Sequence, residues 1–147
     1  MRRSTHALFG LGLSIYVMSR LGYFDNLMIF FGLFFSLLPD LDVSFKHRAL
    51  LHNLFSAVAL SWAIPYFSES YILSMQLSAL SWIDFFATSL IAYLSHLLLD
   101  LITKGGVELF WPLSENRFRI ASLRYNDPAA NALLSLAGGL LIVFTFV

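Results

Sequence analysis

Long apolar stretches separated by short polar clusters make up most of the chain. Residues 49–68 and 128–147 contain no Asp, Glu, Lys or Arg. Each stretch has the roughly 20 apolar residues that a helix needs to cross a bilayer. A third apolar run, which contains one histidine, lies between Asp84 and Asp100. This pattern predicts three membrane-spanning helices in the later part of the chain.

Two shorter apolar runs, residues 7–19 and 27–38, precede them. They reach the length of a span only when the surrounding residues 5–24 and 22–39 are counted, with the charged end of Arg20 extended to the membrane interface. The first run, which follows two arginines, also resembles a signal peptide, but no A-x-A-like cleavage site comes after it. We therefore expect both runs to form spans, which gives five in total.

A further segment, residues 71–82, is apolar but rich in serine. Ser74, Ser78 and Ser81 are four and three residues apart, so a helix would place them on one face. Such a pattern is typical of a short interfacial or re-entrant helix, or of an extension of a neighbouring helix. The predicted fold is all-α: a polytopic membrane helix bundle of about five transmembrane helices plus this short helix, in a single domain over residues 1–147.

The composition agrees with a membrane protein. Hydrophobic residues make up 59% of the chain and charged residues 12%, whereas soluble proteins have about 45–50% and about 25%. So few polar side chains could not cover the surface of a soluble protein of 147 residues. The absence of cysteine excludes disulfides, iron–sulfur clusters and thiolate zinc sites. Nine basic and nine acidic residues leave no basic tail or patch, so we expect membrane lipid and no nucleic acid as a partner.

The distribution of Lys and Arg indicates how the chain crosses the membrane. With the N-terminus in the cytoplasm, and residues 71–82 not crossing, eight of the nine basic residues lie on the cytoplasmic side, in agreement with the positive-inside rule. Only Arg20 lies outside. The predicted cytoplasmic loops are residues 39–48 and 104–128. The predicted location is the bacterial inner membrane or its archaeal equivalent.

All four histidines of the chain, and three aspartates beside them, fall on that predicted cytoplasmic side. His96 and Asp100 are four residues apart, so they share one face of a helix. Pro39 ends the second apolar run, and we expect Asp40 and Asp42 to point the same way in an extended segment. An ionisable side chain at bilayer depth costs about 2.5–3.5 kcal/mol and usually serves a function. The seven residues are His6, Asp40, Asp42, His47, His52, His96 and Asp100.

Imidazole and carboxylate groups are standard ligands of zinc, manganese and iron. Seven such residues exceed the three protein ligands of a catalytic zinc ion, and they suffice for two ions. Each residue also has a structural explanation, since interfacial histidines form hydrogen bonds and aspartates cap helices or turns. That explanation does not account for every histidine of the chain lying on one face beside a carboxylate motif. We therefore predict a divalent metal site.

The same motifs resemble those of the YdjM-like family. They are, in order, Thr5-His6, LLPDLD, HRALLH, and HLLLDLITKGGVELFWP followed by NRFR, so the resemblance runs from His6 to Arg119. It implies a membrane-bound metal-dependent hydrolase, in a family also described as LexA-binding or LexA-regulated inner-membrane proteins. That family is regarded as distantly similar to zinc-dependent phospholipase C enzymes. This implies zinc, as one to three ions, with the seven residues as its ligands or their immediate partners. Those soluble enzymes also use their N-terminal amine as a ligand, and nothing in the sequence suggests this role for Met1.

The leading hypothesis is a metal-dependent hydrolase of a phosphoester, in a lipid or another amphiphile, with its active site at the cytoplasmic face. Asp42 or Asp100 would orient or deprotonate the attacking water. Arg48 or Arg117, on the same membrane face, would stabilise the charge that develops on the phosphate, because an arginine fork matches two phosphate oxygens. The same arginines also fit a simpler role as anchors for anionic lipid headgroups.

Two other functions stay open. Histidine and aspartate within spans also build pathways for divalent metal ions or protons. A transporter would need ionisable residues at more than one depth, and the outer half offers only Arg20, Asp25, Glu69 and Asp84. A non-catalytic membrane partner of a regulatory protein would use residues 104–130 as a binding surface, which would leave the histidines unexplained.

Overall fold

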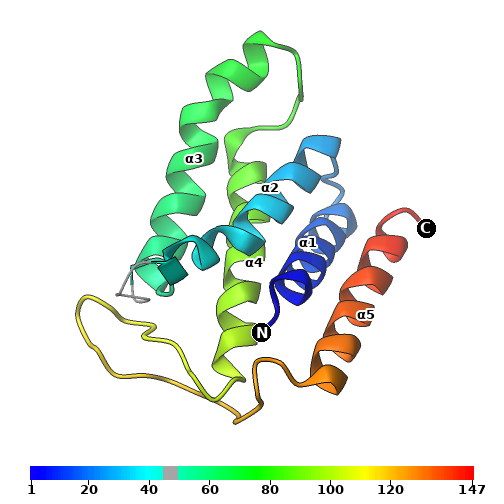
Figure 1. Cartoon of the computed structure of the whole chain (residues 1–147). Helices are drawn as coiled ribbons and strands as arrows, with labels where there is room; N and C mark the ends of the chain where they lie inside the picture. Colours follow the sequence, from blue (N-terminus) through cyan, green and yellow to red (C-terminus); the bar gives the residue numbers. More distant parts are fainter. Residues whose placement is uncertain (45–49) are drawn as a thin grey trace.

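The computed structural model describes residues 1–44 and 50–147. The elements are α1 Arg3–Arg20, α2 Asn26–Leu37, the 3-10 helix η1 Leu38–Ser44, α3 Leu54–Ser74, α4 Trp82–Leu101 and α5 Pro128–Thr145. The described residues contain no β-strand, which confirms the all-α class. α1, α2 and α3 pack against α4, and α5 packs against α1 (Figure 1). This arrangement makes α4 the central helix of the bundle.

Polar side chains at the helix starts explain where the helices begin. Asp25, Asn53 and Asp127 accept hydrogen bonds from backbone N–H groups in the first turns of α2, α3 and α5. Ser81 and Asp84 form a reciprocal capping box at the start of α4. These caps satisfy backbone donors that a helix cannot pair internally. Three of the few acidic residues, Asp25, Asp84 and Asp127, therefore serve helix ends.

Two of the five helices, α4 and α5, are long and apolar enough to cross a membrane among the described residues, whereas the sequence predicted five such spans. α2 has 12 residues, which gives about 18 Å and falls short of the ~30 Å hydrocarbon core. The arginines at both ends of α1, and the serines and Glu69 of α3, make these two helices less apolar than a typical span. The described residues thus contain five α-helices, and two of them, not five, have the length and composition of a span.

The short separate helix predicted over residues 71–82 does not form. α3 continues through Ser74, in agreement with the alternative of an extended neighbouring helix, and residues 75–81 form the turn to α4. Gln76 adopts a positive φ of 54°, a conformation typical of the residue that ends a helix. The Ser78 hydroxyl donates a 2.9 Å hydrogen bond to Asp25. Ser74 therefore ends α3, Ser78 lies in this turn and Ser81 caps α4, so the serines do not share one face of a helix.

The core places α4 firmly against its neighbours. Phe35, Phe85 and Tyr93 are fully buried aromatic side chains of α2 and α4. α1 and α5 approach closely at Gly12 and Gly138, where a Cβ on either glycine would meet the backbone of the other helix. Only 11% of the apolar helix α5 is buried in the protein. An apolar helix exposed to this extent suits a lipid environment.

Candidate metal centre

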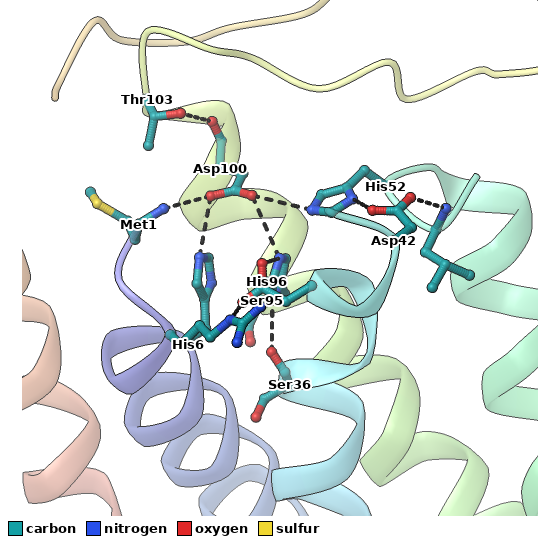
Figure 2. Close-up of polar contacts among 12 residues, drawn as sticks. Met1, His6, Ser36, Asp42, His52, Ser95, His96, Asp100 and Thr103 are labelled. Carbon is teal, nitrogen blue, oxygen red and sulfur yellow. Dashed lines mark hydrogen bonds and ion pairs between the residues drawn. The ribbon is translucent and has the colours of Figure 1, made fainter. Parts of the chain in front are cut away.

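Polar side chains from four parts of the chain meet at one end of the bundle (Figure 2). His6 comes from the first turns of α1, and His96 and Asp100 come from the last turns of α4. Asp40 lies on η1, and His52 lies just before α3. These are five of the seven residues that the sequence predicted as metal ligands, and the fold brings them together.

Three histidines surround the carboxylate of Asp100. Nε2 of His6 lies 3.2 Å from Oδ1, and Nε2 of His96 and of His52 lie 3.5 and 3.6 Å from Oδ2. Asp40 is next to them, with its Oδ1 3.9 Å from Nε2 of His96. Two overlapping groups, His6–His96–Asp100 and Asp40–His52–His96, each have ligand atoms within 4.8 Å of one another and could hold a metal ion.

Two of these histidines have a defined tautomer. Nδ1 of His96 lies 2.8 Å from the carbonyl oxygen of Ser36, and Nδ1 of His52 lies 3.0 Å from Oδ1 of Asp42. A carbonyl and an ionised carboxylate only accept hydrogen bonds, so Nδ1 carries the hydrogen in both rings. In the neutral rings Nε2 then presents its lone pair toward Asp100. This is the arrangement typical of metal-binding histidines, whose second nitrogen is held by an oxygen.

The lone pairs that face one another leave a place for a cation. Nε2 of His6, Nε2 of His96 and Oδ2 of Asp40 are buried and have no hydrogen-bond partner among the residues that the structure describes. Each buried polar atom without a partner costs about 1–3 kcal/mol. A cation bound between these atoms would remove that cost. The donor set, made of imidazole nitrogen and carboxylate oxygen, therefore fits a divalent metal ion.

The surroundings of His52 favour the neutral form of its ring. Burial lowers the pKa of His52 below its ordinary value of 6.5, and the nearby His96 lowers it further, against the raising effect of Asp42 and Asp100. The rings of His6 and His96 stack with centroids 3.8 Å apart and an angle of 17° between their planes. Neutral imidazole is the form that binds metal.

Asp42 lies behind His52 and does not belong to either ligand group. Its carboxylate is 2% exposed and accepts hydrogen bonds from Nδ1 of His52 and from the backbone N–H of Leu51, at 3.0 and 2.8 Å. The expectation that Asp40 and Asp42 point the same way is wrong, because η1 is a 3-10 helix and not an extended segment. Residues two apart in a 3-10 helix diverge by about 120° around its axis.

The predicted residues His47 and Arg48 lie outside the described residues. Arg117 is described, and its Nε donates a 2.8 Å hydrogen bond to Glu108. Arg117 also lines a pocket beside the candidate metal centre. The predicted catalytic arginine on this loop is therefore near the centre but already paired with a carboxylate.

This pocket has a volume of about 990 Å³ and reaches the centre itself, since Asp40, His52 and Asp100 line it. Nε of Arg3 lies 3.7 Å from Oδ2 of Asp40. The basic side chains that line the pocket are Arg2, Arg3, Lys104, Arg117 and Arg124, and the acidic ones are Asp40, Asp100 and Glu108. A pocket with this excess of positive charge attracts anions.

The N-terminal amine of Met1 lies at the centre, although the sequence suggested no role for it. The amine donates a 2.7 Å hydrogen bond to Oδ1 of Asp100. Sequence spacing could not reveal this contact, because 99 positions separate the two residues. Only the packing of α1 against α4 brings them together.

Two further polar residues support the centre and were also missed. The buried amide of Asn131 on α5 accepts hydrogen bonds from the Thr5 hydroxyl and from the backbone N–H of Arg2, at 2.7 and 3.0 Å. These bonds hold the first turn of α1, which carries His6. The hydroxyl of Tyr93 donates a 2.6 Å hydrogen bond to the carbonyl of Leu51, next to His52. In the sequence, Asn131 could have been noticed as a polar amide inside the apolar stretch 128–147, because a polar residue within a membrane span usually serves a function.

Comparison with known proteins gives one match. The model of the family described as YdjM inner membrane protein matches residues 1–147, the whole chain. No curated protein and no solved structure matches the chain. The apolar helices α4 and α5 agree with the membrane location that the family description states. The chain therefore belongs to the YdjM inner membrane protein family.

Proposed function

We propose that the chain is a membrane-embedded, metal-dependent hydrolase that cleaves a phosphoester in a lipid or another amphiphile at the cytoplasmic face of the membrane. The observation that carries the proposal is the convergence of Nε2 of His6, His52 and His96 on the carboxylate of Asp100. Neutral imidazoles with a carboxylate are ligands typical of catalytic zinc. A bound divalent cation would act as a Lewis acid toward water and a phosphoryl oxygen.

The tautomer of His96 limits how ions can share the centre. Both ligand groups include His96, but its Nδ1 is bound to the Ser36 carbonyl, so only Nε2 can bind metal. One lone pair serves one ion. We therefore assign His6, His96 and Asp100 to a first zinc ion. A second ion would depend on Asp40, His52 and the other oxygen of Asp100.

The aspartates take different roles in this proposal. Asp42 is buried and accepts two hydrogen bonds, so it is suited to orient His52 and poorly placed to receive a proton from water. Asp40 lines the pocket, and its Oδ2 has no hydrogen-bond partner among the described residues. A carboxylate that lines the pocket beside the centre, with Nε of Arg3 3.7 Å from its Oδ2, is suited to act as a general base. We therefore favour Asp40 as the base, in place of the Asp42 or Asp100 predicted from the sequence.

The basic residues of the pocket support an anionic, phosphate-bearing substrate. Arg3 is close to Asp40, and Lys104 and Arg124, which lie in the segment between α4 and α5, also line the pocket. Guanidinium groups match pairs of phosphate oxygens. These side chains would hold the phosphate group, and Arg117 would join them if its bond to Glu108 opened.

The placement of the site at the cytoplasmic face rests on the basic residues. Arg2, Arg3 and Lys104 line the same pocket as Asp40, His52 and Asp100, and so lie at the same end of the bundle as the centre. Arg20 ends α1 at the opposite end, where it donates a hydrogen bond to the Phe144 carbonyl. The positive-inside rule then supports an orientation with the N-terminus and the centre on the cytoplasmic side.

A transporter is less well supported, because the ionisable residues at the other end are engaged in local structure. Asp25 caps α2, Asp84 caps α4, and a carboxylate oxygen of Glu69 accepts a hydrogen bond from the Trp82 backbone. Between the two ends of the central helix α4, residues 85–99 contain no Asp, Glu, Lys or Arg. A pathway for ions would need such groups along its course.

Metal analysis of the detergent-purified protein tests the proposal. We expect one or two zinc ions per chain, lost in His96→Ala and in Asp100→Asn, and kept in Glu115→Gln, which changes an exposed carboxylate on the same side. The metal-loaded protein should hydrolyse a chromogenic phosphodiester, and the two metal-free variants should not. A chain that carries no metal and binds no added zinc would overturn the proposal. Metal uptake into vesicles without hydrolysis would favour a transporter.

A further inference from the structure

We infer that residues 102–127, here called the membrane-face arm, rest on the bilayer surface and insert apolar side chains at the boundary between lipid headgroups and acyl chains. The arm joins α4 to α5 and runs across the end of the bundle at the bottom of Figure 1. None of the helices named above lies within the arm. The inference concerns how the protein meets lipid, and it depends neither on the metal nor on hydrolysis.

The arm has a defined conformation. Val107 and Phe118 exchange two backbone hydrogen bonds of 2.9 Å across it. Further along, the carbonyl of Leu109 accepts a 3.0 Å hydrogen bond from the backbone N–H of Leu54 at the start of α3. The arm is therefore paired with itself and attached to the start of α3, and the backbone N–H of Ile120 donates a 2.8 Å hydrogen bond to the carbonyl of Leu101 at the end of α4. This pairing fixes the backbone that carries the exposed side chains.

Six large apolar side chains of the arm are exposed: Phe110, Leu113, Phe118, Ile120, Leu123 and Tyr125. Leu113 is 80% exposed and Ile120 is 72% exposed. The exposure of such side chains to water is unfavourable. A group of them on one segment marks an interaction site. An apolar environment must therefore cover the arm.

The position of the arm identifies lipid as that environment. α4 ends at Leu101 and α5 begins at Pro128, and both helices are long and apolar enough to cross the membrane. The arm therefore leaves the bilayer and returns to it at the same face. Both of its ends are fixed at the membrane surface, which is the place where apolar and aromatic side chains of interfacial segments insert.

The charges of the arm agree with anionic headgroups. Arg117 pairs with Glu108, and Asp127 caps α5. The other charged residues of the arm are Lys104, Arg119, Arg124 and Glu115. Three basic residues against one acidic residue, interspersed with exposed apolar side chains, are typical of a segment that binds an anionic membrane surface. Since the arm forms one wall of the pocket, its contact with lipid brings the pocket to the level of the headgroups.

Cysteine labelling tests the inference cleanly, because the chain has no cysteine of its own. Leu113→Cys and Ile120→Cys would carry a small environment-sensitive fluorophore at the two most exposed large apolar positions of the arm, and Asn116→Cys would be the exposed polar control. The labelled full chain is reconstituted in vesicles of phosphatidylcholine with or without phosphatidylglycerol. Nitroxide-labelled lipid then reports contact with the bilayer, and iodide reports contact with water.

We expect nitroxide lipid to quench the labels at positions 113 and 120 several-fold more than the label at 116, with the opposite order for iodide. Arg119→Gln should reduce lipid quenching only in vesicles that contain phosphatidylglycerol. Equal iodide access and no lipid quenching at all three positions would overturn the inference. Protection from iodide that disappears when chains are diluted below one per vesicle would assign the surface to a second copy. Protection that requires an added soluble protein would assign it to a regulatory partner, and both results contradict a lipid contact.

Discussion

The carboxylate of Asp42 lies 3.0 Å from Nδ1 of His52, on the side of the ring opposite to the metal centre. This contact determines which ring nitrogen faces Asp100, because the hydrogen on Nδ1 is held by Asp42 and Nε2 is left with its lone pair. Asp42 is thus part of the centre through the orientation of His52. Its position leads to the first of five predictions.

Asp42→Asn should weaken the binding of the second metal ion, which depends on His52, about 10–100-fold, since the loss of such an outer partner typically has this effect. The amide can still contact His52, but it no longer selects one tautomer of the ring. The fold should be retained, because the amide has nearly the same size as the carboxylate. Competition with a chromophoric zinc chelator measures the affinity, and Glu115→Gln is the control. An unchanged affinity would show that His52 needs no orientation by Asp42.

Replacement of Asp40 should separate catalysis from metal binding. If Asp40 is the base, Asp40→Asn should lower the hydrolysis rate about 10²–10⁴-fold, the usual contribution of general base catalysis. A first zinc ion held by His6, His96 and Asp100 should remain bound. Rates with a chromogenic phosphodiester and the zinc content of the same preparation provide the two readouts. Loss of the metal together with the activity would instead identify Asp40 as an essential ligand.

If the proposed metal ion is bound, its removal should destabilise the protein, because the ion would pair with buried ring nitrogens of His6 and His96 that otherwise have no hydrogen-bond partner among the described residues. A ligand present at 100 times its Kd stabilises the folded state by about 2.7 kcal/mol. We therefore expect a chelator to lower the unfolding temperature in detergent, and added zinc to restore it. His96→Ala should unfold at the lower temperature with or without the chelator. A wild-type protein that is indifferent to the chelator would contradict the metal centre.

Asn131→Ala should act on the centre from α5. The Thr5 hydroxyl and the Arg2 backbone N–H would both lose their acceptor, at a cost of about 1–3 kcal/mol. Because these groups hold the first turn of α1, the position of His6 should become less defined and zinc affinity should fall. Chemical unfolding in detergent and zinc titration test the two effects. Asn116→Ala, at an exposed amide, should change neither quantity.

Two adjacent glycines offer a matched test of the contact between α1 and α5. A Cβ at Gly138 would collide with the backbone of Leu8 and Phe9, whereas a Cβ at Gly139 would meet nothing within 4 Å. Gly138→Ala should destabilise the protein by about 1–3 kcal/mol through overpacking. Gly139→Ala should stabilise it by roughly 0.5–1 kcal/mol, because alanine favours the helix. Equal unfolding free energies for the two variants would mean that the close contact is absent.

Much of the site could be predicted because an ionisable residue inside a bilayer costs free energy and is therefore rare unless it serves a function. His6, His52, His96, Asp40 and Asp100 were recognisable as a set from their residue types and from their shared side of the membrane. The spacing of His96 and Asp100 also indicated a shared helix face, and their side chains lie 3.5 Å apart. His47 was predicted on the same grounds and lies outside the described residues.

Other features depended on conformations that residue types do not specify. Asp40 and Asp42 were expected in an extended segment, and the 3-10 helix after Pro39 turns them to different partners. The serines at 74 and 78 have helical spacing, yet the positive φ of Gln76 places them on different elements. In both cases a local pattern fitted two backbone conformations, and tertiary contacts selected one.

The sequence by itself determined the class of the protein: apolar stretches that make helices, a membrane location, and a nitrogen-and-oxygen ligand set in a chain without cysteine. Only the tertiary structure decided the role of each group. It turned Nε2 of His52 and His96 toward Asp100, placed Asp42 behind His52, and brought the Met1 amine to a carboxylate 99 positions away. Hydrophobicity depends on composition along the chain, whereas ligand geometry depends on atoms that only helix packing brings within a few ångströms of one another.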